Sequence, residues 1–339
     1  MAMRHARRRG KVLEVAAALV AAALGSDAAC AQQTVKLNEV LRSLFYTPQY
    51  VALRIGAFEQ EGIKIDGPKT TWGMQAALTE IVSGNSNIAL LGPEAASLTQ
   101  DAGPERRLMN FAQLTAGDGS FIISKTPMPG FKIADLKGKT IVTAGKGATP
   151  SLVLERLLKQ AGLDPAKDVN IRYIPQSGNI LPSFLEPSTQ FGQAFEPGVQ
   201  LTVSQGKGHR VAAVHALAGP MPYTAYLASV AFIEKNPKII QGFTNAIYRG
   251  LLHTEKSSAA EIAKLVAPDF KDVPVETIEA VVAEYKKIKI WATNPLIEEK
   301  GMAIMTDMMF EAGVIKAKVA YDKVVNPTFA KQALQTIKP

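Results

Sequence analysis

The chain has 339 residues, of which 47% are hydrophobic and 20% charged, with a formal net charge of +8 and a single cysteine. No low-complexity tract or long run of like charges interrupts it, so its composition excludes a disordered chain or a coiled coil. Its length favours two lobes of roughly 100 to 200 residues each. The positive charges are spread along the chain, which excludes a nucleic-acid footprint.

The first 31 residues have the pattern of an export signal. Basic residues at 4–11 precede an alanine- and leucine-rich run at 12–24, and a small-x-small site follows at 29–31. The apolar run is too short to cross a bilayer. We therefore predict cleavage before Gln32, which leaves 33 basic and 28 acidic residues and no cysteine. Such a mature chain has no disulfide, no thiolate zinc site and no cysteine nucleophile.

Two alternatives remain open for this segment. Cys30 could instead carry a lipid, although Asp27 and the neighbouring alanines match a lipoprotein signal poorly. The Arg8-Arg9 pair leaves both twin-arginine and general secretion possible.

From residue 34 onward, short apolar runs alternate with amphipathic segments. In the first part we predict strands at 35–40, 63–65, 88–91 and 108–114 and helices at 48–61 and 73–83. The repeated order of strand, helix and strand predicts an α/β fold with a mostly parallel sheet that is covered on both faces.

A second run of the same kind follows. We predict strands at 121–124, 140–143, 169–173, 191–195, 211–214 and 223–230, and helices at 151–161 and 179–185. The rest is predicted to be helical, with helix starts at Asn236-Pro237, Asn294-Pro295 and Asn326-Pro327. This order predicts lobe I at 32–120 and 228–339 and lobe II at 121–227, with residues 121–124 and 223–227 crossing between them and the helical tail padding lobe I.

Three turns place a small residue before a proline at the start of a helix, namely Thr47-Pro48, Gly92-Pro93 and Thr149-Pro150. We interpret the first residue of each pair as the helix cap. Helices that begin in this way direct their free N–H groups out of the carboxyl edge of a sheet, which suits a polar or anionic small molecule. The sequence therefore predicts a ligand cleft at these turns.

Five segments together resemble a known family: residues 48–65, 73–95, 136–175, 191–197 (FGQAFEP) and 222–228 (PYTAYLA). The chain is similar there to the periplasmic substrate-binding proteins of ABC importers for nitrate, sulfonates, taurine and thiamine pyrimidines. The similarity extends from about residue 35 to 330. It implies a two-lobed type II binding-protein fold with two hinge strands, closure on a small molecule, and delivery to a membrane permease and its ATPase. Residues 185–189 depart from the usual small, glycine-rich stretch.

The aromatic residues Tyr46, Tyr50 and Trp72 could enclose a flat ligand, although Tyr50 could equally be core. The Thr149 hydroxyl could form a hydrogen bond with the ligand. Glu196 could accept hydrogen bonds from the ligand, or could be an acid favoured at a helix start. We expect Trp72 and Glu196 to face the same cleft from opposite lobes. The complete set of predicted ligand-binding residues is Tyr46, Tyr50, Trp72, Gly73, Met74, Gly92, Glu94, Gly117, Gly147, Thr149, Gln176, Asn179, Phe195, Glu196 and Tyr223.

Catalysis has little support. Beyond the signal, only His209, His215 and His253 remain, with no metalloprotease or hydrolase motif. Thiamine-pyrimidine synthesis, an enzyme activity on a related fold, relies on a cysteine-rich motif that the mature chain lacks.

We expect a monomeric periplasmic receptor without cofactor or metal. The ligand that we expect is a small aromatic or heteroaromatic carboxylate or sulfonate. A thiamine-like pyrimidine is the second hypothesis for the ligand. A sensor or adaptor for a membrane receptor is the alternative function.

Overall fold

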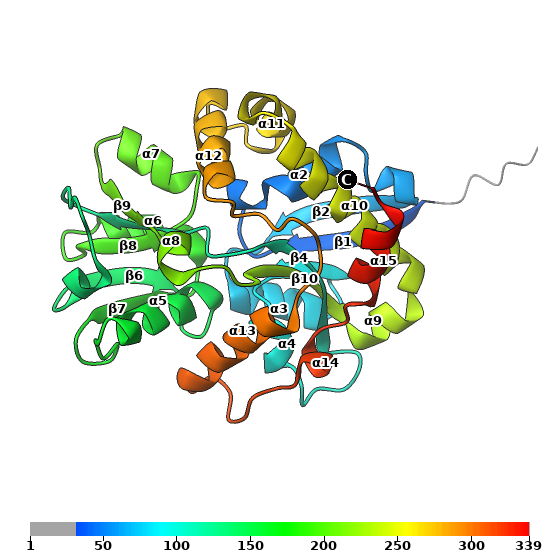
Figure 1. Ribbon diagram of the computed structural model, residues 1–339, viewed down its shortest axis with the longest axis horizontal. Helices are drawn as coiled ribbons and strands as arrows, with labels where there is room; N and C mark the ends of the chain where they lie inside the picture. Colours follow the sequence, from blue (N-terminus) through cyan, green and yellow to red (C-terminus); the bar gives the residue numbers. More distant parts are fainter. Residues whose placement is uncertain (1–31, 339) are drawn as a thin grey trace, which may run out of the picture. The chain divides into compact units, whose positions relative to one another are not determined.

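The computed structural model describes residues 32–338, so the predicted signal peptide and Cys30 lie outside the described residues. Two five-stranded sheets organise the described chain (Figure 1). The first has the order β2-β1-β3-β10-β4 and the second β7-β6-β8-β5-β9. Their bounds are β1 Gln33–Glu39, β2 Ile63–Thr70, β3 Ile88–Leu91, β4 Leu108–Thr115 and β10 Thr224–Ser229, and β5 Phe121–Ser124, β6 Thr140–Ala144, β7 Asn170–Ile174, β8 Phe191–Ala194 and β9 His209–Ala213.

Both sheets are mixed, because each has one strand, β10 or β5, that runs antiparallel to its two neighbours within the mostly parallel arrangement that the sequence predicted. Strands β1 and β3 are parallel, as are β6 with β7 and with β8. In contrast, β10 is antiparallel to β3 and β4, and β5 is antiparallel to β8 and β9. Each of these two strands enters its sheet directly from a crossing segment rather than through a helix, so it is not bound to the direction that a strand-helix-strand unit imposes.

Residues 116–120 and 219–223 cross between the sheets and run side by side, whereas the predicted crossing residues 121–124 belong to β5 of the second sheet. The Met221 N–H donates to the Ala116 carbonyl at 2.9 Å, and the Tyr223 N–H donates to the Thr115 carbonyl at 3.2 Å. Strand β10 follows at once and belongs to the first sheet, so its residues 224–227 pair there rather than with the second sheet. The division into two moving lobes stays a prediction.

Helices follow most of the strands, and the carboxyl-terminal region is helical, as predicted. The helices are α2 Thr47–Arg54, α3 Met74–Val82, α4 Glu94–Leu98, α5 Thr149–Gln160, α6 Ile180–Leu185, α7 Gly198–Ser204, α8 Val214–Ala218, α9 Val230–Lys235, α10 Pro237–Lys256, α11 Ala259–Val266, α12 Val275–Lys287, α13 Glu299–Glu311, α14 Tyr321–Val324 and α15 Thr328–Thr336. Short 3-10 turns include η1 Leu44–Tyr46 and η2 Glu59–Glu61. The helix predicted at 48–61 therefore ends early, at Arg54.

No helix begins at Asn294-Pro295, contrary to the prediction, and α13 starts at Glu299 instead. Residues 291–295 lie along the free edge of β4. There the Gln113 N–H donates to the Pro295 carbonyl at 2.8 Å and the Ala292 N–H donates to the Leu114 carbonyl at 3.0 Å. Backbone groups at a buried strand edge need partners, and this extended segment supplies them.

The threonines before the two prolines are not caps. Thr47 and Thr149 are the first residues of α2 and α5, and neither preceding residue makes a side-chain cap. The Thr47 hydroxyl donates backwards to the Leu44 carbonyl at 2.6 Å. The pattern located the helix starts within a residue, but it assigned the wrong partners to the hydroxyl groups.

Helix α10 packs closely on α2, because Gly250 has no side chain. A Cβ atom at this position would lie 2.3 Å from the Pro48 carbonyl oxygen and 2.8 Å from the Ala52 Cβ. The backbone of α2 cannot move aside as a flexible side chain could.

We expect Gly250→Ala to lower the free energy of unfolding by about 1 to 3 kcal/mol, since the added methyl overpacks this contact. Gly103→Ala is the matched control, because a Cβ at Gly103 meets no atom within 4 Å. Urea unfolding curves measure both. Equal midpoints for the two variants would show that the α2–α10 contact tolerates the extra methyl.

Candidate functional site

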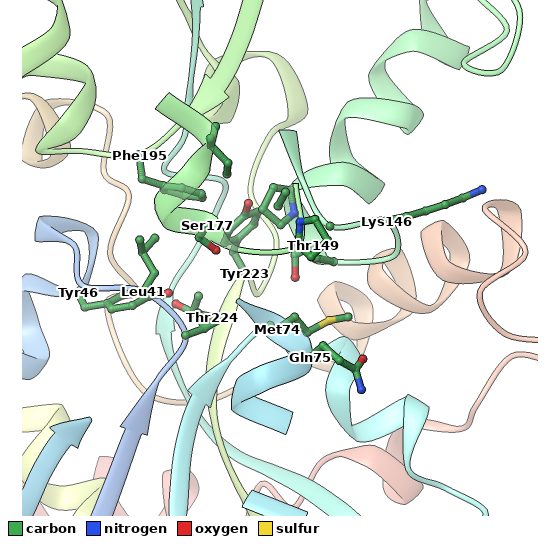
Figure 2. A pocket seen from close by; sticks show the side chains of 18 residues that line it. Leu41, Tyr46, Met74, Gln75, Lys146, Thr149, Ser177, Phe195, Tyr223 and Thr224 are labelled. Atoms are coloured by element: carbon green, nitrogen blue, oxygen red, sulfur yellow. The ribbon is translucent and has the colours of Figure 1, made fainter. Parts of the chain in front are cut away.

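A cavity of about 180 Å³ lies among loops that follow the strands of both sheets (Figure 2). Its aromatic residues are Tyr46 from η1, Phe195 after β8 and Tyr223 before β10. Aliphatic side chains complete the wall: Val40, Leu41, Met74 and Ile180. The polar side chains are Gln75, Lys146, Thr149, Ser177 and Thr224. A mostly apolar hollow with a few polar groups is typical of small-molecule sites.

The aromatic wall is supported by Phe45, which is fully buried. Its ring stacks on Phe195 with centroids 5.5 Å apart and meets the Tyr223 ring edge-on at 5.7 Å. Such ring pairs are favourable beyond the area that they bury. Because Phe45 belongs to the turn after β1 and Phe195 follows β8, this contact joins the ends of the two sheets beside the cavity.

A buried carboxylate fills the start of α5. Glu94 Oε1 accepts from the Thr149 N–H at 2.9 Å, and Glu94 Oε2 accepts from the Thr149 hydroxyl at 2.6 Å. A Cβ at Gly92 would lie 2.1 Å from both the Thr149 hydroxyl and Glu94 Oε2, so this contact requires a glycine there. Burial raises the pKa of Glu94 above its ordinary value, and the hydrogen bonds from Thr149 act in the opposite direction.

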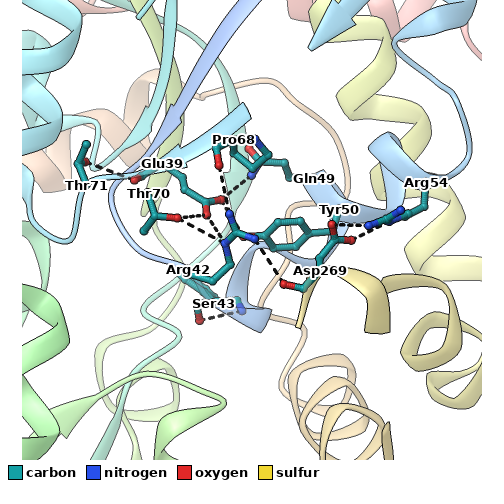
Figure 3. A network of polar contacts seen from close by, with 11 residues as sticks. Glu39, Arg42, Ser43, Gln49, Tyr50, Arg54, Pro68, Thr70, Thr71 and Asp269 are labelled. Carbon is teal, nitrogen blue, oxygen red and sulfur yellow. Dashed lines mark hydrogen bonds and ion pairs between the residues drawn. The ribbon is translucent and has the colours of Figure 1, made fainter. Parts of the chain in front are cut away.

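A second buried carboxylate, Glu39, holds the turn after β1 in place (Figure 3). It accepts from Arg42 Nε at 2.7 Å, the Tyr50 hydroxyl at 2.7 Å and the Gln49 amide at 2.9 Å. These bonds tie the turn to α2. Val40, Leu41 and Tyr46, which belong to this turn, line the cavity.

A third carboxylate, Asp118, lies in the outward crossing segment. It accepts from the Ser120 N–H at 2.8 Å and from the Gln193 amide at 3.2 Å. Burial raises the pKa of Asp118 from 3.8 to about 6. The phenol of Tyr223, in the returning segment, has its pKa raised by burial and then by Asp118.

Six of the predicted ligand-binding residues line the cavity: Tyr46, Met74, Gly92, Thr149, Phe195 and Tyr223. Sequence reasoning missed Val40, Leu41 and Ser177 among others. Val40 and Leu41 directly follow β1, so the rule that ligands bind beyond the carboxyl ends of strands could have found them.

The other predicted residues lie elsewhere. Tyr50 belongs to the Glu39 network and packs edge-on against Phe270. Trp72, 43% exposed, lines a neighbouring hollow with Gln176 and Asn179, and this hollow shares Gln75 and Pro175 with the cavity. Three of the others are glycines, where a Cβ would meet the Pro175 carbonyl (Gly73), the His215 ring (Gly117) or, at the ordinary contact distance of 3.5 Å, the Val314 side chain (Gly147). Glu94 does not line the cavity either, but its carboxylate accepts from Thr149.

Glu196 does not face the cavity, which corrects the expectation that it shares one cleft with Trp72. Its carboxylate pairs with Arg210 and accepts from the Gln200 N–H at 2.8 Å, at the start of α7. The alternative interpretation as an acid at a helix start is therefore the right one. The sequence did not reveal Arg210 because it lies on β9, 14 residues away.

Within residues 32–338, no group of three His, Cys, Asp or Glu side chains could hold a metal ion. In the same part of the chain, no helix is both long and apolar enough to span a membrane.

Comparison with known proteins identifies the family of this chain. The family model described as "NMT1/THI5 like" matches residues 45–257. YtlA of Bacillus subtilis (strain 168), named as a proposed binding protein, is 34% identical over 309 residues, which cover 90% of this chain and 92% of YtlA. The chain belongs to the NMT1/THI5-like family.

Solved structures share the fold of this NMT1/THI5-like chain. The periplasmic nitrate-binding protein NrtA of Synechocystis PCC 6803 superposes with a TM-score of 0.79 at 16% identity, over 90% of this chain and 89% of NrtA. The alkanesulfonate-binding protein SsuA of Xanthomonas axonopodis pv. citri, bound to MOPS, gives 0.70 at 16% identity, over 87% and 98%. The fold is that of the periplasmic binding proteins, as the sequence predicted.

The raised pKa of Asp118 predicts a pH dependence of stability. The folded state binds a proton here between pH 3.8 and about 6, where the unfolded state does not. This contribution is therefore fully present below about pH 4 and is lost as the pH rises through about 6, by about 3 kcal/mol at about 1.4 kcal/mol per pH unit.

Urea unfolding of the wild type and Asp118→Asn between pH 4 and 7 measures this effect. The variant removes the titrating group, so we expect the wild type to lose stability relative to it as the pH rises. A stability difference between the two proteins that stays the same across this range would contradict the prediction.

Proposed function

We propose that this protein is the solute-binding receptor of an ABC importer and holds a small organic molecule in the cavity beside Phe195. The observation that carries the proposal is a cavity lined by loops of both sheets, so that a ligand would contact both at once. Closure of two lobes on such a ligand is the usual device of binding proteins of this fold. The relative YtlA, which is named as a binding protein, supports a receptor over an enzyme.

The walls favour a flat or apolar ligand. Tyr46, Phe195 and Tyr223 offer aromatic faces, and the volume of about 180 Å³ resembles that of an engineered cavity of about 150 Å³ that takes benzene. We keep the aromatic or heteroaromatic part of the expected ligand. We do not keep the expected negative charge, although relatives bind nitrate and alkanesulfonates, because Glu94 already occupies the start of α5.

The wider assignment is supported by the shared fold of NrtA and SsuA, which are named as a periplasmic nitrate-binding and an alkanesulfonate-binding protein. We propose the two lobes predicted from the sequence with one boundary moved: lobe I at 32–120 and 224–339 and lobe II at 121–223, because β10 pairs in the first sheet, with a hinge at the crossing segments. The partners would be a membrane permease and its ATPase, and the location the periplasm. Thiamine-pyrimidine capture, or service as a sensor or adaptor for a membrane receptor, are the alternatives.

Export predicts a defined amino terminus. Intact mass of the protein recovered from a periplasmic fraction should match a chain that begins at Gln32, because residues 29–31 form the cleavage site. A lipid-bearing Cys30, or an uncleaved chain, would contradict this.

Ligand capture predicts a strong dependence on Phe195. Thermal-shift screening of single-ring compounds against the purified protein would find ligands, since binding stabilises the folded state. For the tightest hit, calorimetry should show a tenfold to hundredfold loss of affinity in Phe195→Ala, as expected on removing a buried aromatic contact worth about 1 to 3 kcal/mol.

Phe310→Ala is the control for this experiment. Phe310 lies on α13 with 46% of its surface exposed, outside the cavity. We expect it to bind like the wild type. If Phe195→Ala folds and also binds within twofold of the wild type, the cavity is not the ligand site.

A further inference from the structure

The cavity offers little attraction for an anion. Lys146 is the one charged residue among the described residues that line it. Its amine lies 5.9 Å from the centroid of the Tyr173 ring, and Figure 2 shows the side chain extending away from the other labelled residues. A ligand carboxylate or sulfonate in the cavity would therefore meet no cationic side chain directed toward it.

Three buried carboxylates lie behind the walls instead, those of Glu39, Glu94 and Asp118. The negative charges of these carboxylates act electrostatically on the two phenols that line the cavity. After burial, Glu39 and Glu94 are the causes that raise the pKa of Tyr46, and Asp118 and Glu94 contribute in the same way to the pKa of Tyr223. Fields that oppose the ionisation of a phenol also oppose the entry of an anion.

The start of α5 would be the natural place for an anionic ligand, because free N–H groups and the helix dipole favour negative charge there. Glu94 already takes this place through the Thr149 N–H at 2.9 Å. The same carboxylate accepts the Thr149 hydroxyl hydrogen at 2.6 Å. Since a hydroxyl has one hydrogen to donate, Thr149 Oγ1 can offer only lone pairs to the cavity.

We propose that Glu94, held as a carboxylate by the Thr149 N–H and hydroxyl, is a built-in anion that sets the specificity of the cavity, so that the site takes uncharged or cationic ring compounds carrying an N–H or O–H donor and rejects carboxylates and sulfonates. This inference rests on the proposed function. The ligand donor binds Thr149 Oγ1, and its ring lies against Phe195 and Tyr223. Gly92 is required because any side chain there would displace both Glu94 and Thr149.

Glu94→Gln reverses the polarity of this contact. The carbonyl oxygen of the introduced side chain still accepts from the Thr149 N–H, while its amide nitrogen donates to Thr149 Oγ1. The hydroxyl hydrogen is then free to point into the cavity and can donate to an anion. The shape of the site is retained, so charge and hydrogen-bond polarity are the variables that change.

Benzamidine, benzamide and benzoate test the proposal by calorimetry, because they share one ring and differ in the charge of one group. For the wild type we expect benzoate to bind at least tenfold more weakly than benzamidine. In Glu94→Gln this ratio should shrink at least tenfold. The control, Glu105→Gln, removes one negative charge from an exposed surface pair with Lys235 and should leave the ratio unchanged. Benzoate binding to the wild type as tightly as benzamidine, or a ratio unaffected by Glu94→Gln, would overturn the proposal.

A second measurement needs no ring compound. Hydrogen exchange of the Thr149 amide should be slow in the wild type and at least tenfold faster in Glu94→Ala, and sodium nitrate should restore protection in the variant alone. Equal exchange rates of the Thr149 amide in the two proteins would contradict the role proposed for Glu94. If none of the three ring compounds binds any variant while exchange behaves as expected, the cavity assignment under the proposed function fails, whereas Glu94 as the built-in anion stands.

Discussion

Burial of negative charge is the constraint on which this site depends. A carboxylate removed from water is costly unless hydrogen-bond donors surround it. Glu39, Glu94 and Asp118 are all buried, and each accepts from donors in a different part of the chain. Glu39 ties the turn after β1 to α2, Glu94 ties α4 to α5, and Asp118 ties a crossing segment to β8. The polar groups thus hold the apolar walls at their positions.

The fold and the ligand specificity of this protein depend on different features of the chain. The chain shares its fold with nitrate- and alkanesulfonate-binding proteins at 16% identity. A helix start directed at the cleft belongs to the backbone plan, and it suits anions in general. Whether a ligand or the chain itself satisfies that helix start depends on one side chain. In this protein the Glu94 carboxylate accepts from the Thr149 N–H, and under the proposal made above a ligand would meet negative charge at this helix start.

Local patterns in the sequence predicted much of the framework. Strands β3 and β5 were predicted at their observed bounds, and the prolines of residues 48 and 150 marked the starts of α2 and α5. These signals are local because strand alternation, glycine stops and proline starts act over a few residues. Tyr46, Phe195 and Tyr223 were found since each lies just beyond or before a strand end, where ligands gather in α/β proteins.

By itself, therefore, the sequence predicted most of the strands and their order, the family, and several of the turns that line the cavity. The tertiary structure alone decided which polar side chains meet. Glu94 and Thr149 are 55 residues apart and Glu196 and Arg210 are 14 apart, so neither pairing leaves a local trace. The same holds for the antiparallel entry of β10 and for residues 291–295, where a proline signal predicted a helix and the edge of β4 binds an extended segment instead. A carboxylate at a helix start looks the same in sequence whether it faces a ligand or a neighbouring donor, because its partner is chosen by packing between distant segments.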